Sequence, residues 1–416
     1  MFFKAIYILI LGGTIVIDYF AGIYLEKTIN PKKRSLLLVC SIIANVGVLV
    51  VFKYFNFLNQ NITYLSNHFG YRNNIPYLNI LLPVGLSFHT FQAMSYTIEV
   101  YRRNHPAEKH FGYYALYVMY YPQLVAGPIE RPQNILYQFH KKHDFDYDRT
   151  VSGLKRIFWG LFKKIVIADT LAKSVNEYYA NVFHTTTNPF FTIIFFSIQI
   201  YCDFSGYTDI AIGASRIMGI ELMKNFNYPY FAHTITDFWH RWHISLSTWF
   251  RDYLYFPLGG SKTQTLYIRN VLIIFLVSGL WHGANWTFVV WGLIHGCISI
   301  IERLLKISKS KSMLMGISTF VIVSLTWIFF RSENFTVAMQ MFHNLTYKHF
   351  EFDKRLIFMF LGFVLIEYIT YKKQKIVFFD LINNKFIRYA VYLVMIELTL
   401  STFNHYTSQQ FIYFQF

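Results

Sequence analysis

Apolar segments long enough to cross a lipid bilayer recur along the whole of this 416-residue chain. A helix needs about 20 mostly apolar residues to span the hydrocarbon core. Only 14% of the residues are charged, against about 25% in typical soluble domains. A soluble fold with so few charges would expose large apolar patches, whereas lipid accepts a helix that is apolar on every side. The sequence therefore predicts an all-α, polytopic integral membrane protein.

The apolar pattern predicts roughly nine to twelve crossings, in one membrane domain that covers residues 1–416. We expect the first apolar segment to be a retained span rather than a cleaved signal peptide, because it lacks an A-x-A-like site. Shorter apolar runs fit re-entrant or half-spanning helices buried inside protein. The predicted spans are Ala5–Tyr24, Ser35–Tyr54, Tyr77–Val100, Ile157–Ala172, Phe190–Tyr207, Leu266–Val290 with a continuation to Ile301, Met313–Phe330, Leu356–Tyr371 and Ile387–Thr402. The predicted re-entrant segments are Tyr113–Val125, Asp209–Met223 and Thr236–Tyr255.

The chain has a net charge of +16, and its basic residues concentrate in alternate loops. Basic residues cluster after the first span, after the third, around Lys306–Lys311 and around Lys372–Arg388, whereas loops such as Asn56–Pro76 have almost none. The positive-inside rule places the basic loops in the cytoplasm and the N-terminus outside, in a multi-pass protein of the cytoplasmic (inner) membrane. Because the basic residues lie between apolar segments rather than on a soluble domain, we expect the lipid bilayer, and no nucleic acid, as the partner.

The segment Glu130–Lys164 carries many basic residues interleaved with aromatic and aliphatic ones. That pattern favours amphipathic helices anchored at the cytoplasmic surface of the membrane. The alternative is a surface that binds an anionic cytoplasmic ligand.

Ionisable residues within apolar segments are costly and usually functional, and here they concentrate between Tyr201 and His295. The densest block contains Asp237, His240 and His243 among aromatic residues. On one continuous helix these three side chains would share a face.

His282 lies within a strongly apolar run and is followed by Gly283, Ala284 and Asn285. The small residues would let a substrate approach the imidazole, and Asn285, three residues further on, would orient the ring. A single buried histidine is most often a hydrogen-bonded core residue. Imidazole is also the side chain best suited to proton transfer near neutral pH, so His282 is a candidate general base that deprotonates a hydroxyl as it attacks a thioester.

Two other classes of function compete with this interpretation. His240, His243 and His282 could supply three nitrogen ligands to zinc, but an H-x-x-H step is a weak signal and no cysteine accompanies it, so we predict no metal. A transporter or channel would also place charges in its spans, but no inverted repeat with matching broken helices is evident.

Five segments together resemble the membrane-bound O-acyltransferase family, and they occur in the family's order over nearly the whole chain. The branch that they resemble most contains the membrane proteins of alginate and peptidoglycan O-acetylation, with the D-alanylation protein of teichoic acid more distant. The matching segments are Leu82–Ser87, Leu124–Pro132, Asp203–Gly213, Phe238–Gly260 and Ser278–Trp286.

The resemblance implies a ring of helices around a central tunnel, with His282 as the catalytic histidine and His243 as a second catalytic residue. It also implies a cytoplasmic thioester donor, acetyl-CoA, with no tightly bound cofactor. An extracytoplasmic acyltransferase would receive the acyl group and modify a surface polysaccharide, and D-alanyl transfer to teichoic acid is the alternative. No residues are assigned to binding the donor. The candidate tunnel residues are His240, Trp281, Asn285, Trp286, Arg251, Asp252, Asp203, Ser205 and Tyr207.

Two groups of these candidate tunnel residues have simpler interpretations. Arg251 and Asp252 can form an internal ion pair that holds a short helix without touching substrate. Asp203, Ser205 and Tyr207 either pack against neighbouring helices or line the tunnel.

Overall fold

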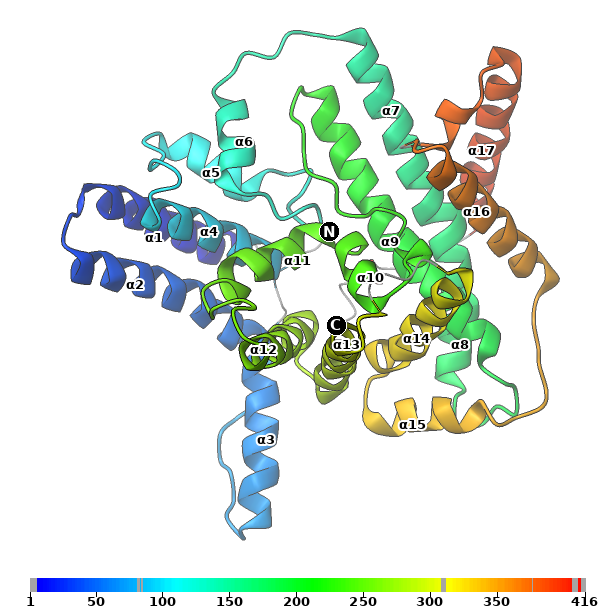
Figure 1. Cartoon of the computed structure of the whole chain (residues 1–416), viewed down its shortest axis with the longest axis horizontal. Helices are drawn as coiled ribbons and strands as arrows, with labels where there is room; N and C mark the ends of the chain where they lie inside the picture. Colours follow the sequence, from blue (N-terminus) through cyan, green and yellow to red (C-terminus); the bar gives the residue numbers. More distant parts are fainter. Residues whose placement is uncertain are drawn as a thin grey trace. The chain divides into compact units, whose positions relative to one another are not determined.

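The computed structural model describes residues 6–80, 83, 85–307, 312–375, 377–405 and 411–412, and these residues form helices joined by loops (Figure 1). Within these ranges the only β-type pairing is an isolated bridge between Thr187 and His349. The predicted all-α class is confirmed.

Side-chain capping explains where many of the helices begin. An Asn, Asp, Ser or Thr side chain accepts a hydrogen bond from a backbone N–H of the first turn, which would otherwise lack a partner. These N-cap residues are Asn30, Asp146, Thr234, Thr263, Asn285, Ser312, Asn334 and Asp353.

The contacts divide the chain into two compact units, so the single domain predicted over residues 1–416 stays a prediction. The first unit contains Met1–Asp144 and Ile220–Leu222, and the second contains Phe145–Gly219 and Met223–Phe416. The helices of the first unit are α1 (Ile6–Lys27), α2 (Pro31–Leu49), the π-helix η1 (Val50–Tyr54), α3 (Phe55–His68), α4 (Leu86–Tyr101), α5 (Phe111–Met119) and α6 (Pro132–Phe139).

The core of the first unit is formed by α1, α2 and α4, which pack on one another. Asp18 on α1 is fully buried there, and its carboxylate accepts hydrogen bonds from Ser41 at 2.6 Å and from Asn45 at 2.8 Å. A polar group within a membrane helix is stabilised by such partners on neighbouring helices.

The second unit holds all the residues from which the candidate site is built. Its helices are α7 (Tyr147–Phe162), η2 (Lys163–Ala168), α8 (Asp169–Ala180), α9 (Phe190–Ile217), η3 (Pro229–Phe231), α10 (Ile235–Arg241), α11 (Ile244–Phe250), η4 (Arg251–Tyr255), α12 (Gln264–His282), α13 (Trp286–Leu304), α14 (Met313–Arg331), α15 (Phe335–Asn344), α16 (Lys354–Lys372), η6 (Phe378–Leu381) and α17 (Lys385–His405). Its core is rich in aromatic side chains, among them the buried Trp242, Trp291 and Trp327.

Helices α7 and α9 approach each other closely at two pairs of glycines. A Cβ atom added to Gly160 would lie 2.5 Å from the carbonyl oxygen of Gly206, and one added to Gly213 would lie 2.6 Å from that of Gly153. Glycine at these positions lets two membrane helices come together backbone to backbone.

Two ion pairs, each with one buried partner, connect the α7–η2 segment with α9. Lys163 contacts Asp209 at 2.6 Å, and Lys164 contacts Asp203 at 2.8 Å. The end of the basic segment Glu130–Lys164, predicted to be a membrane-surface anchor, therefore turns its two lysines toward α9. Lys163 itself is buried.

Seven helices among the described residues are long and apolar enough to cross a membrane, which confirms a polytopic membrane protein. The predicted range of roughly nine to twelve crossings also counts shorter or more polar segments, which do not belong to this set of seven. The seven candidate spans are Ile8–Lys27, Pro31–His68, Phe190–Ile217, Gln264–His282, Trp286–Leu304, Met313–Arg331 and Lys385–Phe403.

Three boundary predictions were wrong. The predicted span Tyr77–Val100 starts too early, because α4 begins at Leu86. The segment Asp209–Met223 is not a separate re-entrant helix, because α9 continues without a break to Ile217. The run from Leu266 to Ile301 is not one span but two, α12 and α13, which are joined by a short connection. Their backbones are in contact, since a Cβ on Gly279 would lie 2.4 Å from the carbonyl oxygen of Phe288.

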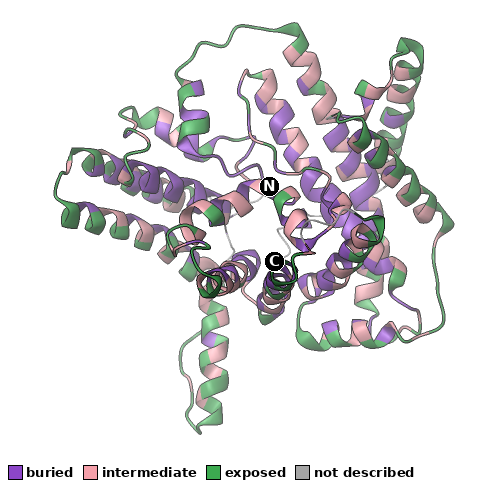
Figure 2. Ribbon diagram, in the orientation of Figure 1, coloured by how far each residue is buried: buried purple, intermediate pink, exposed green. Residues whose placement is uncertain are grey.

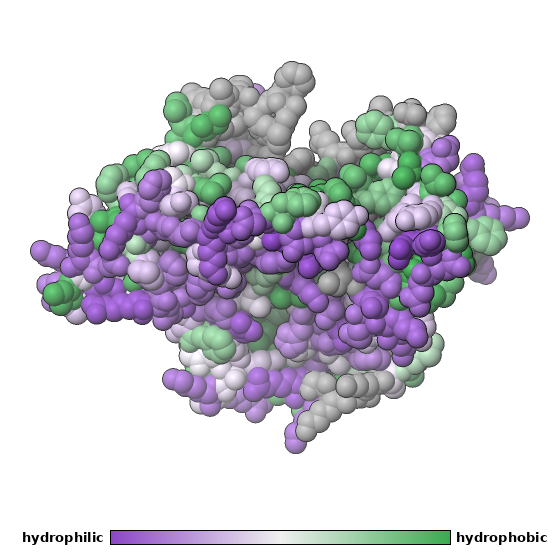
Figure 3. Space-filling model, turned by 90° about the horizontal axis from the view of Figure 1, so that it is seen from above, coloured by the Kyte–Doolittle hydropathy of each residue, from purple (hydrophilic) through white to green (hydrophobic). Residues whose placement is uncertain are grey.

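Large apolar side chains lie exposed on the surface, as expected of a protein that contacts lipid. Figure 2 shows α17 largely exposed and α9 largely buried within the second unit. On α17, Phe386, Leu393 and Phe403 are at least 60% exposed. Figure 3 shows that hydrophobic and hydrophilic side chains gather in separate areas of one face.

Candidate functional site

His282 is the last residue of α12 and is buried among aromatic rings. The helix ends there because Gly283 is extended and Asn285 begins the next helix as its N-cap. The imidazole contacts Trp291 at 5.1 Å and Phe330 at 5.4 Å between ring centroids, both edge to face. The ring therefore lies in an apolar environment at a helix end.

His243 lies between α10 and α11 and is completely buried. Its backbone is left-handed (φ 43°, ψ 54°), which is uncommon for a residue with a side chain and requires support from its surroundings. That support comes from the segment around Asn225, whose carbonyl oxygen accepts the N–H of Ile244 at 2.9 Å.

The hydrogen bonds of Asn225 assign the tautomer of His243. The Oδ1 atom of Asn225 is an acceptor, because the backbone N–H of Ser245 donates to it at 3.2 Å and the Ser245 hydroxyl donates at 2.9 Å. Nδ1 of His243, 3.1 Å from the same oxygen, must then carry the proton. Burial lowers the pKa of His243, which lies outside the seven candidate spans, to about 3. The ring is therefore neutral at pH 7, and its lone pair is on Nε2.

Trp281 connects the two histidines predicted to be catalytic. Its ring centroid lies 5.9 Å from that of His243 and 4.9 Å from that of His282. The structure thus brings His243, Trp281 and His282 together in one buried cluster. The catalytic roles of the two histidines and the tunnel position of Trp281 stay predictions.

Two geometric predictions about this cluster were wrong. His240 does not share a helical face with His243, because α10 ends at Arg241 and His240 is exposed. Asn285 caps α13, accepting from the N–H of Thr287 at 3.2 Å and donating to the carbonyl oxygen of Glu333 at 2.6 Å. It therefore stabilises the start of a helix and does not orient the ring of His282.

The predicted pair of Arg251 and Asp252 is present on the π-helix η4, with 2.8 Å between Nε and Oδ1. Arg251 is more than half exposed, which fits a local ion pair better than contact with a buried substrate. Trp286, at the start of α13, is also about half exposed.

The three predicted residues on α9 have different surroundings. The carboxylate of Asp203 accepts the backbone N–H of Ile412 at 2.7 Å in addition to its pair with Lys164. The hydroxyl of Ser205 accepts a hydrogen bond from Lys163 at 2.9 Å, beside a cavity that it helps to line. The ring of Tyr207 contacts that of Phe411.

Among the residues that the structure describes, no group of three or more His, Cys, Asp or Glu side chains is arranged to hold a metal ion.

Two polar residues next to the site did not emerge from the sequence. Asn225 carries no charge and lies in a loop, so only its structural contacts reveal it.

His295 had the same signal as His282, an ionisable group in an apolar run. Its Nδ1 accepts from the indole N–H of Trp239 at 3.3 Å, so its Nε2 donates to Thr326 at 2.9 Å. Both ring nitrogens have partners, and His295 is a core residue.

The part of the chain that contains this cluster matches a known protein family. Residues 102–378 match the model of the membrane-bound O-acyltransferase family, and the chain belongs to that family.

Three curated relatives indicate where in the family the chain falls. It is 38% identical over 344 residues to the probable alginate O-acetylase AlgI of Pseudomonas aeruginosa, which covers 81% of this chain and 65% of that protein. It is 34% identical over 373 residues to the peptidoglycan O-acetyltransferase of Helicobacter pylori, with 82% and 70% covered. The teichoic acid D-alanyltransferase of Bacillus subtilis is 29% identical over 247 residues, with 54% and 61% covered. The chain spans just under two thirds of the length of the alginate relative.

Proposed function

We propose that this protein is a membrane O-acyltransferase that takes an acetyl group from cytoplasmic acetyl-CoA for the O-acetylation of an extracytoplasmic polysaccharide. The observation that carries the proposal is the buried cluster of His243, Trp281 and His282 in a chain of this family. Relatives named for O-acetylation align over more of the chain, and at higher identity, than the D-alanyltransferase.

The proposed reaction needs a base at the attacking hydroxyl. A neutral ring nitrogen of His282 takes the proton of the acceptor's hydroxyl group as the hydroxyl oxygen attacks the thioester carbonyl carbon of acetyl-CoA. The carbon–sulfur bond then breaks, and the thiolate leaves with the proton returned by the imidazolium. The aromatic rings around His282 would exclude water, which would otherwise hydrolyse the thioester.

His243 is proposed to act beside His282, as a second base or as an orienting group. Its tautomer suits this role, because Nε2 can accept a proton or a hydrogen bond while Asn225 holds Nδ1. On the extracytoplasmic side, a separate acyltransferase would receive the acetyl group and complete the modification.

The substitution His282→Ala tests the assignment. With radiolabelled acetyl-CoA and membranes that contain equal amounts of protein, we expect labelled acetyl transfer to fall by about 10²- to 10⁴-fold, the usual contribution of a general base. His184→Ala is the matched control, since His184 is exposed and outside the cluster, and it should retain full activity. Full activity in His282→Ala would refute the catalytic role. Transfer only from an aminoacylated carrier protein would favour D-alanylation.

A further inference from the structure

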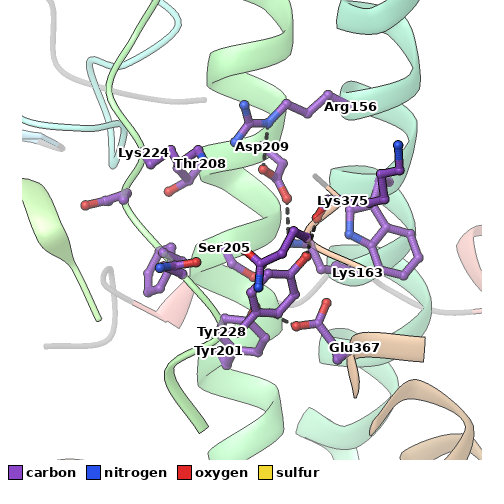
Figure 4. Close-up of a pocket in the computed structure, with 15 residues that line it drawn as sticks. Arg156, Lys163, Tyr201, Ser205, Thr208, Asp209, Lys224, Tyr228, Glu367 and Lys375 are labelled. Carbon is purple, nitrogen blue, oxygen red and sulfur yellow. Dashed lines mark hydrogen bonds and ion pairs between the residues drawn. The ribbon is translucent and has the colours of Figure 1, made fainter. Parts of the chain in front are cut away.

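A polar cavity of about 90 Å³ lies in the second unit, beside Asn225. Helix α7 and η2 supply Arg156 and Lys163, α9 supplies Thr208 and Asp209, and the loop after α16 supplies Lys375. Figure 4 shows these side chains converging from separate helices, with Asp209 between Arg156 and Lys163. A space of this size has room for a small polar group.

The cavity carries an excess of positive charge. Four cationic side chains line it, namely Arg156, Lys163, Lys224 and Lys375. The lining contains two carboxyl groups, those of Asp209 and Glu367. One carboxyl, Asp209, already pairs with Arg156 at 2.9 Å and with Lys163 at 2.6 Å. Within the described part of the chain, Lys224 and Lys375 have no ion-pair partner, and both are exposed at the cavity.

The loop that carries Lys375 is held at this place by a specific contact. The hydroxyl of Tyr228, which also lines the cavity, donates a hydrogen bond to the carbonyl oxygen of Lys375 at 2.6 Å. The fold therefore fixes the backbone of the loop that places Lys375 at the opening.

Two buried polar groups in the cavity wall have no hydrogen-bond partner among the described residues. They are Nδ2 of Asn225, a side chain that is 1% exposed, and the hydroxyl of Thr208, which is 2% exposed. Buried donors of this kind are nearly always satisfied in folded proteins. The Asn225 amide cannot rotate to exchange its two ends, since its oxygen accepts from Ser245 and His243. A ligand that supplies acceptor oxygens would satisfy both groups.

We propose that this cavity binds a phosphate group of the thioester donor and that the bound group holds Asn225 in place against His243. Positive charge with amide and hydroxyl donors is the chemistry that recognises phosphate oxygens. The assignment to the donor rests on the proposed function, and on the basic loop after α16, which the positive-inside rule places in the cytoplasm. Donor binding would thereby be connected to the second histidine of the site through one amide.

The test compares two double substitutions in the full-length protein in detergent, on a His282→Ala background. Lys224→Gln with Lys375→Gln removes two charges from the cavity, and Lys348→Gln with Lys373→Gln removes two exposed charges outside it. Binding of coenzyme A and of pantetheine, which lacks phosphate, is measured at one ionic strength. We expect the first pair to weaken coenzyme A binding at least tenfold, and neither pair to change pantetheine binding.

Equal effects of the two pairs on coenzyme A, or no effect of either, would overturn the proposal. An anionic lipid headgroup as the ligand gives a different result: coenzyme A binding is unchanged, and the extra stabilisation in phosphatidylglycerol over phosphatidylcholine nanodiscs is lost only in the cavity variant. That result would overturn the donor as the source. Because binding is measured without turnover, failure here is distinct from failure of the acetyl-transfer assay.

Discussion

The hydrogen-bond partners of a buried imidazole determine which ring nitrogen carries the proton and which can accept one, as His243 and His295 illustrate. Trp239 can only donate, so Nδ1 of His295 accepts and its proton lies on Nε2, where Thr326 binds it. Asn225 presents an oxygen to His243, so there the proton lies on Nδ1 and Nε2 has the lone pair. Two residues of the same type, both deeply buried, thus have opposite tautomers.

The substitution Asn225→Asp should make the activity sensitive to acid. An aspartate keeps an oxygen toward Nδ1 but adds a negative charge, which favours the imidazolium and raises the pKa of His243 from its low value. As the pH falls through the raised pKa, Nε2 becomes protonated and can no longer act as an acceptor. We expect the acid limb of the kcat–pH profile to move upward by about one unit or more. Asn225→Ala should lower kcat without moving that limb. Superimposable profiles for Asn225→Asp and the parent would contradict the proposal that His243 acts through its contact with residue 225.

At this scale the sequence identifies ionisable residues better than their partners. His282 and His243 are found from residue type, because a histidine in an apolar segment is rare. The roles of Asn285 and His240 were misjudged because both arguments assumed a continuous helix, and the chain breaks at both places. Asn225 could not be predicted, since its importance depends on contacts with residues about 20 positions away in the chain.

At the scale of the helices, glycine contacts determine how closely α7 and α9 approach. The paired positions Gly153 with Gly213 and Gly160 with Gly206 show that the two helices run antiparallel. The close approach allows Lys163 and Asp209 to meet across the interface at 2.6 Å. The cavity lined by both of these side chains therefore depends on the spacing of the two helices.

Adding methyl groups at the glycine contacts should separate the helices. Gly160→Ala and Gly206→Ala each place a Cβ atom within 2.8 Å of a backbone oxygen on the opposite helix. Overpacking of this kind costs about 1–3 kcal/mol, so each variant should lower the Tm of the purified protein and its activity. Gly362→Ala is the matched control, because no atom lies within 4 Å of the added Cβ. It should leave the Tm unchanged or raise it slightly, and equal Tm values for all three variants would contradict the packing argument.

Apolar periodicity located most of the helices but not every break between them. The run from Leu266 to Ile301 contains no charged break in its centre, so composition alone joins α12 to α13. The connection is a helix end, a short extended segment and an N-cap, which are local features of Gly283 and Asn285. A break that is itself packed among apolar residues leaves little trace in hydropathy.

For the molecule as a whole, the candidate spans and the basic loops together define an expected orientation. The helix Pro31–His68 contains 38 residues, about 57 Å of helix, nearly twice the hydrocarbon thickness of about 30 Å. It starts beside the basic residues Lys32 and Lys33, so α3 is expected to emerge on the extracytoplasmic side. The predicted ring and tunnel concern the arrangement of the two units and stay a prediction.

Cysteine labelling in intact cells tests this orientation. In a background with alanine at positions 40 and 297, Asn67→Cys on α3 should react with a membrane-impermeant maleimide. Lys373→Cys, in the loop after α16, should react only after the membrane is permeabilised. The cysteine-depleted parent gives the background signal. The reverse pattern of labelling would mean that the orientation is inverted.

The two ion pairs between η2 and α9 have a consequence for biogenesis. A lysine or aspartate placed alone at the centre of a bilayer costs about 2.5–3.5 kcal/mol during insertion. Lys163 finds its counter-charge in Asp209, which is synthesised more than forty residues later, whereas Lys164 pairs both with Asp203 on α9 and, at 2.8 Å, with Asp169 in its own segment. The α7–α8 segment and α9 would therefore enter the lipid as a neutralised pair, and the translocon would have to retain the earlier segment until the later one emerges from the ribosome.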